Sequence, residues 1–255
     1  MNFIASASTD IGIKKNTNQD SLSVKVINTP AGRLCFAIIC DGMGGLEKGE
    51  VASRSVIEAF DRWVYNDLPQ LCQSGIDDYT IRSQWGNIVY EQNERIKEYG
   101  RGLGVNLGTT VAVLLLTENR YYILNVGDSR VYQIDGGLSV LTKDQTLVAQ
   151  EVEMGMLTPE QAAVDPRRNV LLQCVGASDT VTPDFFFGDT QQNAVYMLCS
   201  DGFRHEISAE EIYQWFEPNR MVDEYSMKQN MDSLIELNKS RMETDNISVI
   251  TVRTF

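Results

Sequence analysis

The chain has 255 residues, of which 43% are hydrophobic and 22% charged, and its formal net charge is −13. This composition is ordinary for a globular protein that can bury its own core. The acidic charge argues against nucleic acid or an anionic membrane as the main partner. No apolar run approaches the roughly 20 residues of a membrane helix, and the N-terminus lacks the pattern of a signal peptide.

The cysteines point to a reducing compartment. There are five of them, an odd number, and none forms a Cys-x-x-Cys pair. Three lie inside predicted core strands, where a cysteine acts as a small apolar residue. We therefore expect reduced thiols and a cytoplasmic protein.

The first half of the chain predicts strands followed by helices. Three strands are expected over 2–10, 20–28 and 33–41, with the last two joined as a hairpin through the turn at 29–32. Apolar residues then recur at helical spacing in two segments, so we expect amphipathic helices over 49–65 and 78–99. The residues between these helices, which include Pro69 and Gly75, are expected to form a connection, and the glycine-rich segment 100–108 a loop.

The second half repeats this order. Strands are expected over 109–116, 120–126, 130–135, 138–142, 181–187, 195–200 and 246–252. Helices are expected over 208–216 and 221–240, the first opened by a capping box at Ser208. The segment 146–168 interrupts the strands with two short helical patterns, and we expect it to form a flap on the main body. Hairpin-linked strands with grouped helices favour an α+β fold with sheets inside and helices outside.

Four aspartates stand at the ends of predicted core strands. Asp41 follows the apolar run 35–40 and precedes Gly42, Asp201 ends a similar run before Gly202, and Asp128 follows Gly127. Asp245 opens the last predicted strand. An Asp-Gly pair alone is more often a turn than a ligand, but four such sites together favour a shared function. We expect the glycines after Asp41, namely Gly42, Gly44 and Gly45, to adopt positive φ and allow a close approach to a ligand.

Carboxylates at rigid strand ends are the ligands that hard cations prefer. The chain has a single histidine, His205, which excludes a His-rich zinc site and makes a catalytic triad an unfavourable reading. Two Mg²⁺ or Mn²⁺ ions bridged by one carboxylate would hold a hydroxide for in-line attack on phosphorus. The sequence therefore favours metal-assisted phosphoryl chemistry without a side-chain nucleophile.

The chain contains six short motifs in this order: Asn18-Gln19-Asp20, Asp41-Gly42-Met43-Gly44-Gly45, Gly108-Thr109-Thr110, Gly127-Asp128-Ser129-Arg130, Ser200-Asp201-Gly202-Phe203 and Asp245-Asn246-Ile247-Ser248. Together they resemble the motifs of the metal-dependent protein phosphatases of the 2C type, and in particular those of their compact bacterial members. The resemblance covers essentially the whole chain, so it implies one catalytic domain over 1–255. It further implies a four-layer α-β-β-α sandwich, in which helix pairs flank two central, mostly antiparallel sheets.

The resemblance also implies roles for single residues. Asp41 would bridge two Mn²⁺ or Mg²⁺ ions, and the Gly42 carbonyl would bind the second ion. Asp201 and Asp245 would hold the first ion, and Asp20 would act through metal-bound waters. Asp128 would help to hold a third, weaker ion, and the flap would affect substrate choice. The implied activity is hydrolysis of phosphoserine and phosphothreonine, which reverses the action of a bacterial protein kinase. No heptad or exposed apolar stripe argues for assembly, so we expect a monomer.

Three positions depart from the family pattern. Lys15 stands where many relatives carry an arginine that grips the substrate phosphate, and Lys14 would serve if the loop shifted by one residue. Gln145 replaces a histidine at the start of the flap, after Asp144. Met43 replaces the histidine of eukaryotic members, as it does in bacterial relatives. No metal ligand is lost, so we expect an active enzyme.

Less specific interpretations stay open beside this one. The chain would alternatively be a catalytically weak relative that binds phosphoproteins as a regulatory protein, or a phosphatase for one dedicated partner. His205 would be structural, and the turn at Asp128 would be only a turn. The sequence names neither the substrate protein nor the kinase, and it does not separate Mn²⁺ from Mg²⁺.

Overall fold

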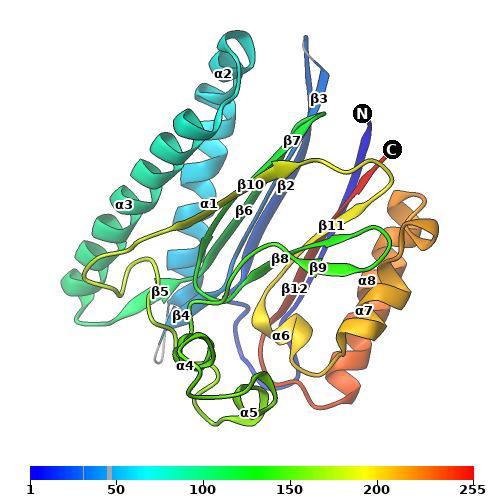
Figure 1. Cartoon of the computed structure of the whole chain (residues 1–255). Helices are drawn as coiled ribbons and strands as arrows, with labels where there is room; N and C mark the ends of the chain where they lie inside the picture. The colour runs from blue at the N-terminus through cyan, green and yellow to red at the C-terminus, as the bar shows by residue number, and fades with distance from the viewer. Residues whose placement is uncertain (31, 45–47) are drawn as a thin grey trace.

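Two antiparallel sheets of five strands each face one another in the centre of the molecule (Figure 1). The computed structural model describes residues 1–30, 32–44 and 48–255. The first sheet has the order β1 (Phe3–Asp10), β12 (Ile247–Thr254), β11 (Val195–Cys199), β8 (Arg130–Ile134) and β9 (Leu138–Val140). The second has the order β10 (Asp184–Asp189), β7 (Arg120–Val126), β6 (Val111–Leu116), β3 (Gly32–Cys40) and β2 (Ser21–Thr29).

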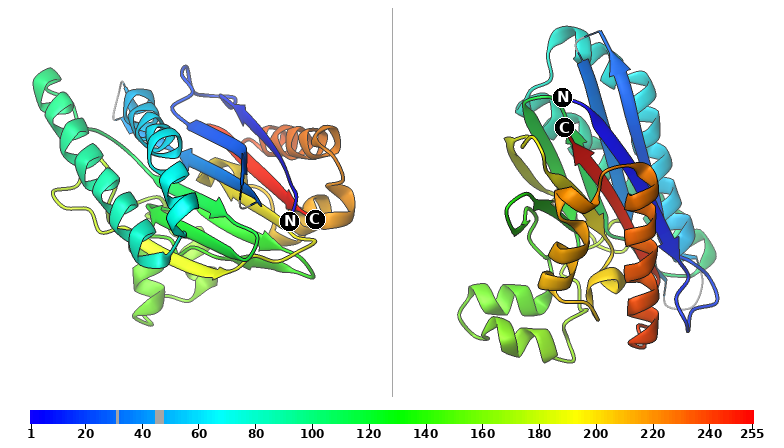
Figure 2. Two further views of the ribbon diagram at one scale, coloured as in Figure 1. Left: turned by 90° about the horizontal axis from the view of Figure 1, so that it is seen from above. Right: turned by 90° about the vertical axis from the view of Figure 1, so that its right-hand side faces the viewer.

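Helices cover the outer face of each sheet, and Figure 2 shows the two helical layers on either side of the strands. The second sheet carries α1 (Gly49–Asn66), α2 (Leu68–Ser74) and α3 (Asp78–Leu103). The first carries α6 (Asp201–Arg204), α7 (Ala209–Phe216), a 3-10 turn (Pro218–Arg220) and α8 (Glu224–Ser240). The expected α-β-β-α sandwich is confirmed.

The side chains of β3 explain why its sequence is apolar without a break. Phe36, Ile38 and Cys40 pack in the cluster under α1 and α3, whereas Cys35, Ala37 and Ile39 pack between the two sheets. Since successive side chains of a strand point to opposite faces, a strand with both faces buried needs apolar residues at every position. A third cluster lies between the first sheet and helices α7 and α8.

The flap segment projects from one end of the sandwich, the lower end in Figure 1. It contains α4 (Leu147–Glu153) and α5 (Pro159–Val164), and Thr158 and Gln161 form a capping box at the start of α5. A small sheet of β4 (Gly42–Gly44) and β5 (Leu107–Thr109) lies at the same end.

Several expected boundaries are wrong, and local packing explains them. The expected connection at 66–77 contains α2, because Pro69 stands in the first turn of a helix, where proline is tolerated. The expected loop at 100–108 is partly helix and partly β5. Gly100 continues α3 because its missing side chain lets the helix approach the backbone of Val105. α8 starts at Glu224 rather than 221, since Asp223 caps it.

Two further expectations need correction. The strand expected at 181–187 begins at Asp184, directly after Pro183. Gly42 is not among the glycines with positive φ, and Gly45 lies outside the described residues. The predicted hairpin of β2 and β3 is confirmed by their register. Among the described residues, no helix combines the length and apolar character that a membrane crossing requires.

Candidate metal centre

The strand register brings the five predicted aspartates to one end of the sandwich. Ser21 pairs with Cys40, so Asp20, which precedes β2, and Asp41, which follows β3, are neighbours at the end of these two strands. Cys199 pairs with both Arg130 and Val249. The ends of β8, β11 and β12 that lie beside Asp128, Asp201 and Asp245 are therefore at the same end of the first sheet. The turn at Gly127–Ser129 runs from β7 in one sheet to β8 in the other. Asp128 therefore lies where the two sheets meet.

The backbone at Asp41 is held from both sides. Its N–H donates to the hydroxyl of Thr110 at 3.0 Å, and its carbonyl accepts from the hydroxyl of Thr109 at 2.9 Å. The Gly42 N–H donates to the Gln19 carbonyl at 3.2 Å. A Cβ on Gly42 would lie 2.4 Å from the carbonyl oxygens of both Gln19 and Gly49. Glycine is thus required here because the chains approach closely, and not because of its φ.

Asp20 is buried, and no described residue pairs with its carboxylate as a cation. The residue is 9% exposed, and its carboxylate lacks a hydrogen bond of good geometry, although the nearby hydroxyls of Ser248 and Ser200 act to lower its pKa. Burial raises the pKa of Asp20 to about 7, and the charge of Asp201 adds to this shift. Burial also raises the pKa of Asp41 well above its usual range, and the negative charges of Asp20 and Asp201 raise it further. The carboxylates therefore repel one another and favour a cation between them.

Asp201 begins the short helix α6 directly after β11. Its Oδ1 atom is buried without a hydrogen-bond partner, and its Oδ2 atom lies 3.4 Å from Nε2 of His205. The other ring nitrogen of His205 lies 3.3 Å from Oε2 of Glu243. Burial alone would lower the pKa of His205, but Glu243 and Asp201 raise it overall. His205 thus lies between Glu243 and Asp201 and helps to fix the orientation of the Asp201 carboxylate.

Lys15 is the predicted cation that reaches the centre. Its Nζ atom lies 2.7 Å from Oδ1 of Asp245. Burial lowers its pKa, but the hydrogen bond and charge of Asp245, with Asp41 and Asp201, raise it overall. The described residues show no ion pair for Lys14. A cavity of about 400 Å³, lined by Lys15, Asp41, Met43, Cys174 and others, opens over these groups.

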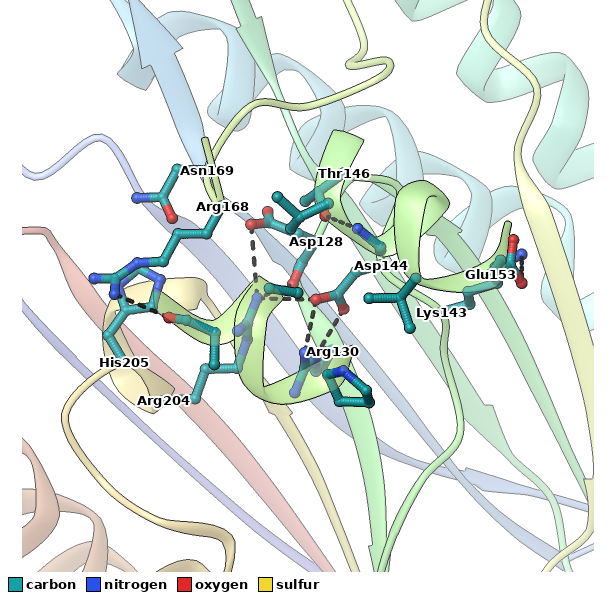
Figure 3. Close-up of a pocket in the computed structure, with 16 residues that line it drawn as sticks. Asp128, Arg130, Lys143, Asp144, Thr146, Glu153, Arg168, Asn169, Arg204 and His205 are labelled. Atoms are coloured by element: carbon teal, nitrogen blue, oxygen red, sulfur yellow. Dashed lines mark hydrogen bonds and ion pairs between the residues drawn. The ribbon is translucent and has the colours of Figure 1, made fainter. Parts of the chain in front are cut away.

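Asp128 has a different environment, which Figure 3 shows. Nη2 of Arg204 lies 3.6 Å from its Oδ2 atom and donates to its backbone carbonyl at 3.0 Å. Burial raises the pKa of Asp128 to about 7, Asp201 adds to the shift, and Arg204 opposes it. Gln145 supports the same turn, because its side-chain oxygen accepts the N–H of Gly127 at 2.8 Å. Its amide also donates to Asp184 at 2.8 Å.

The donor set fits hard divalent cations. Carboxylate oxygens that are buried, unpartnered and mutually repelling are stabilised when a cation binds between them. Within residues 1–30, 32–44 and 48–255, no three acidic, histidine or cysteine side chains already surround a common point as ligands. Asp245 instead pairs with Lys15. A bound ion would therefore compete with the Lys15 ammonium for this carboxylate.

The sequence patterns do not indicate the residues that support the aspartates. They give no signal for Arg204 or Glu243, and they predict a structural role for His205. Only the fold brings Glu243 to His205 and Arg204 to Asp128.

A family model described as protein phosphatase 2C matches residues 13–241. The protein phosphatase PhpP of Streptococcus pneumoniae is 29% identical over 96% of this chain and 94% of its own. A serine/threonine phosphatase structure from S. agalactiae superimposes with a TM-score of 0.85 at 27% identity, covering 100% of both chains. The catalytic domain of the phosphatase PstP in complex with two manganese ions gives a TM-score of 0.77 at 26% identity, covering 98% of this chain and 97% of that one.

Proposed function

Because the chain belongs to the protein phosphatase 2C family, we propose that its five aspartates form the metal-dependent active site of a protein serine/threonine phosphatase. The observation that carries the site assignment is the group of carboxylates at one end of the sandwich, in which Asp20 is buried without a cationic partner among the described residues and Asp201 buries one oxygen without a hydrogen bond. The alternative of a catalytically weak binding protein is not favoured, because no predicted ligand is replaced and the cavity leads to Asp41.

In this proposal Asp41 would be shared by two ions, the Gly42 carbonyl would hold the second ion, and Asp201 and Asp245 would hold the first. Both Mn²⁺ and Mg²⁺ suit such oxygen ligands, and manganese is the ion in the PstP complex. Bound there, the two ions would supply an activated water and stabilise the charge of the phosphoryl group.

The remaining residues position the waters, the substrate phosphate and the Asp41 carboxylate. Asp20 would accept hydrogen bonds from waters at the centre, where its carboxylate is buried beside Asp201. Lys15 attracts the substrate phosphate from the rim of the cavity. The clamped backbone at Asp41 fixes the position of its carboxylate, which preorganises the site.

A third ion at Asp128 is expected to bind more weakly than the other two. Arg204 already places a positive charge 3.6 Å from the Asp128 carboxylate. A cation there must compete with this guanidinium, so its affinity falls.

The proposed substrates are proteins phosphorylated on serine or threonine by a protein kinase, and the chain is proposed to act on them as a monomer. One catalytic domain over 1–255 with a flap at about 146–168 completes this proposal. All five cysteines are free thiols, which supports a reducing compartment such as the cytoplasm.

The test is phosphate release from phosphothreonine, phosphoserine and phosphotyrosine forms of one peptide, with Mn²⁺ and with EDTA. We expect hydrolysis of the first two with Mn²⁺ and none in EDTA. Hydrolysis that EDTA leaves unchanged, or that prefers phosphotyrosine, would contradict the proposal.

A further inference from the structure

A second cavity lies between the flap and the body, beside the metal centre. We call it the flap pocket; its volume is about 480 Å³, and α4, α5, the turn at Asp128 and the end of α6 line it. Asp128 and His205 belong to both the pocket and the centre, since His205 contacts Asp201. The pocket is therefore a direct neighbour of the reacting group.

The pocket is basic in a strongly acidic protein. Arg130, Lys143, Arg168 and Arg204 line it, against three carboxylates. The chain as a whole has a net charge of −13, so the general charge balance does not account for four basic side chains in one place. Such a grouping favours an anion at that position.

Three of the four basic residues already lie in ion pairs, and two of these pairs are close. Arg130 donates to both oxygens of Asp144 at 2.7 Å, a bidentate contact that occupies its guanidinium. Lys143 lies 2.5 Å from a carboxylate oxygen of Glu153.

Arg204 and Arg168 have donors to spare, although Nη2 of Arg204 lies 3.6 Å from Asp128 and 3.4 Å from Asp144. All hydrogen bonds of the Arg204 guanidinium come from Nη2, and its Nε atom is buried without a partner. Arg168 has no acidic partner among the described residues, and its contact with the Ala163 carbonyl is long, at 3.4 Å. Figure 3 shows the Arg168 side chain on the same side of the pocket as His205. Unmet guanidinium donors beside a cavity bind carboxylates and phosphates.

The remaining wall is apolar and comes from the flap. Val148, Val152 and Ala162 line it. This wall suits the methylene groups of a peptide side chain, while the basic residues suit its charged end.

We propose that the flap pocket binds an acidic group of the phosphoprotein substrate, either a carboxylate or a second phosphate that flanks the phosphorylated residue. The proposal rests on the phosphatase function proposed above. An extended peptide advances about 3.3–3.6 Å per residue, so a residue a few positions from the phosphorylated one reaches the pocket. The pocket thereby selects among phosphorylated sites by their neighbours.

The test uses phosphothreonine peptides of one length, in which a single glutamate is moved through the flanking positions, with glutamine at the same position as reference. At one position we expect glutamate to raise kcat/KM about tenfold, the effect of one charge-assisted hydrogen bond. The gain is expected in KM, because the contact is made in the ground state as well as in the transition state. Phosphoserine at that position distinguishes a phosphate from a carboxylate as the preferred group.

Variants of the pocket residues test whether the preference for glutamate arises in the flap pocket. Arg168→Gln should reduce the preference for glutamate to about threefold or less, and Arg204→Gln should act in the same direction. Arg95→Gln, an exposed arginine on α3 outside the pocket, is the matched control and should keep the full preference.

Two results would overturn the inference. One is equal kcat/KM for glutamate and glutamine at every position, and the other is a preference that survives both pocket variants. In either case hydrolysis of the glutamine peptide with Mn²⁺ would still uphold the proposed function. If no peptide is hydrolysed, both proposals fall.

Discussion

At the scale of single residues, Lys15 is the cation that we propose contacts the substrate phosphate. Its ammonium pairs with Asp245 and faces the cavity over Asp41. An ammonium is a compact charge, whereas a guanidinium binds phosphate through two parallel hydrogen bonds.

Lys15→Arg is therefore expected to lower KM for a phosphothreonine peptide about threefold to tenfold, with kcat little changed. Steady-state kinetics with Mn²⁺ measure this, and Lys14→Arg is the control, since Lys14 forms no ion pair within the described part of the chain. An unchanged or higher KM in Lys15→Arg would show that Lys15 does not contact the phosphate.

Gly42 offers a test of the close packing at Asp41. A Cβ there would lie 2.4 Å from two carbonyl oxygens, so Gly42→Ala must push Asp41 away from Gln19 or Gly49. We expect a loss of about 1–3 kcal/mol in the free energy of unfolding and a fall in kcat. Gly102→Ala is the control, because nothing lies within 4 Å of its Cβ position in α3. It should raise stability by about 0.5–1 kcal/mol. Equal stability of the two variants in thermal melts would refute this packing argument.

At the scale of elements, the strands were predictable because burial on two faces leaves an uninterrupted apolar run, as in β3. The boundaries of the helices were less predictable from the sequence. Pro69 and Gly100 both signal a break, yet one starts a helix and the other lies inside one. Their effect depends on neighbours such as Val105 that only the fold supplies.

An ion pair connects the start of α7 to the residue after α8. Glu211 accepts from Arg241 at 2.6 Å and 2.9 Å and from the N–H of Ser208 at 2.8 Å. Arg241 is the main cause that lowers the pKa of Glu211 from 4.5 to about 2. A lowered carboxyl pKa contributes stability that is present above the unfolded value and is lost as pH falls through the folded one.

Glu211→Gln is therefore expected to lower the free energy of unfolding by about 0.5–1 kcal/mol at pH 7. The difference from wild type should shrink as pH falls from about 4.5 toward about 2. Denaturant melts at several pH values measure it, with Glu210→Gln as the control because Glu210 has no basic partner among the described residues. A difference that stays constant down to pH 3 would contradict the assignment of the ion pair.

At the scale of the whole molecule, the sandwich assembles the centre from segments far apart in the chain. Asp20 and Asp245 are separated by most of the sequence, and they meet because β2 and β12 start at the same end of the two sheets. Because aspartates recur at the ends of predicted strands, the meeting of these aspartates could be predicted from the sequence. The partners of those aspartates, such as Arg204 beside Asp128, depend on the crossing from β7 to β8 and could not be predicted.

The central claim is that Asp41, Asp201 and Asp245 hold the ions on which phosphate release depends. The most direct measurement is calorimetric titration of Mn²⁺ into metal-free wild type and Asp201→Asn, with phosphothreonine hydrolysis measured on the same samples. Asp67→Asn is the control, because Asp67 is exposed and its side chain caps no helix. We expect Asp201→Asn to lose high-affinity Mn²⁺ binding and at least about a hundredfold in kcat, while Asp67→Asn matches wild type. Full Mn²⁺ binding and activity in Asp201→Asn would contradict this claim.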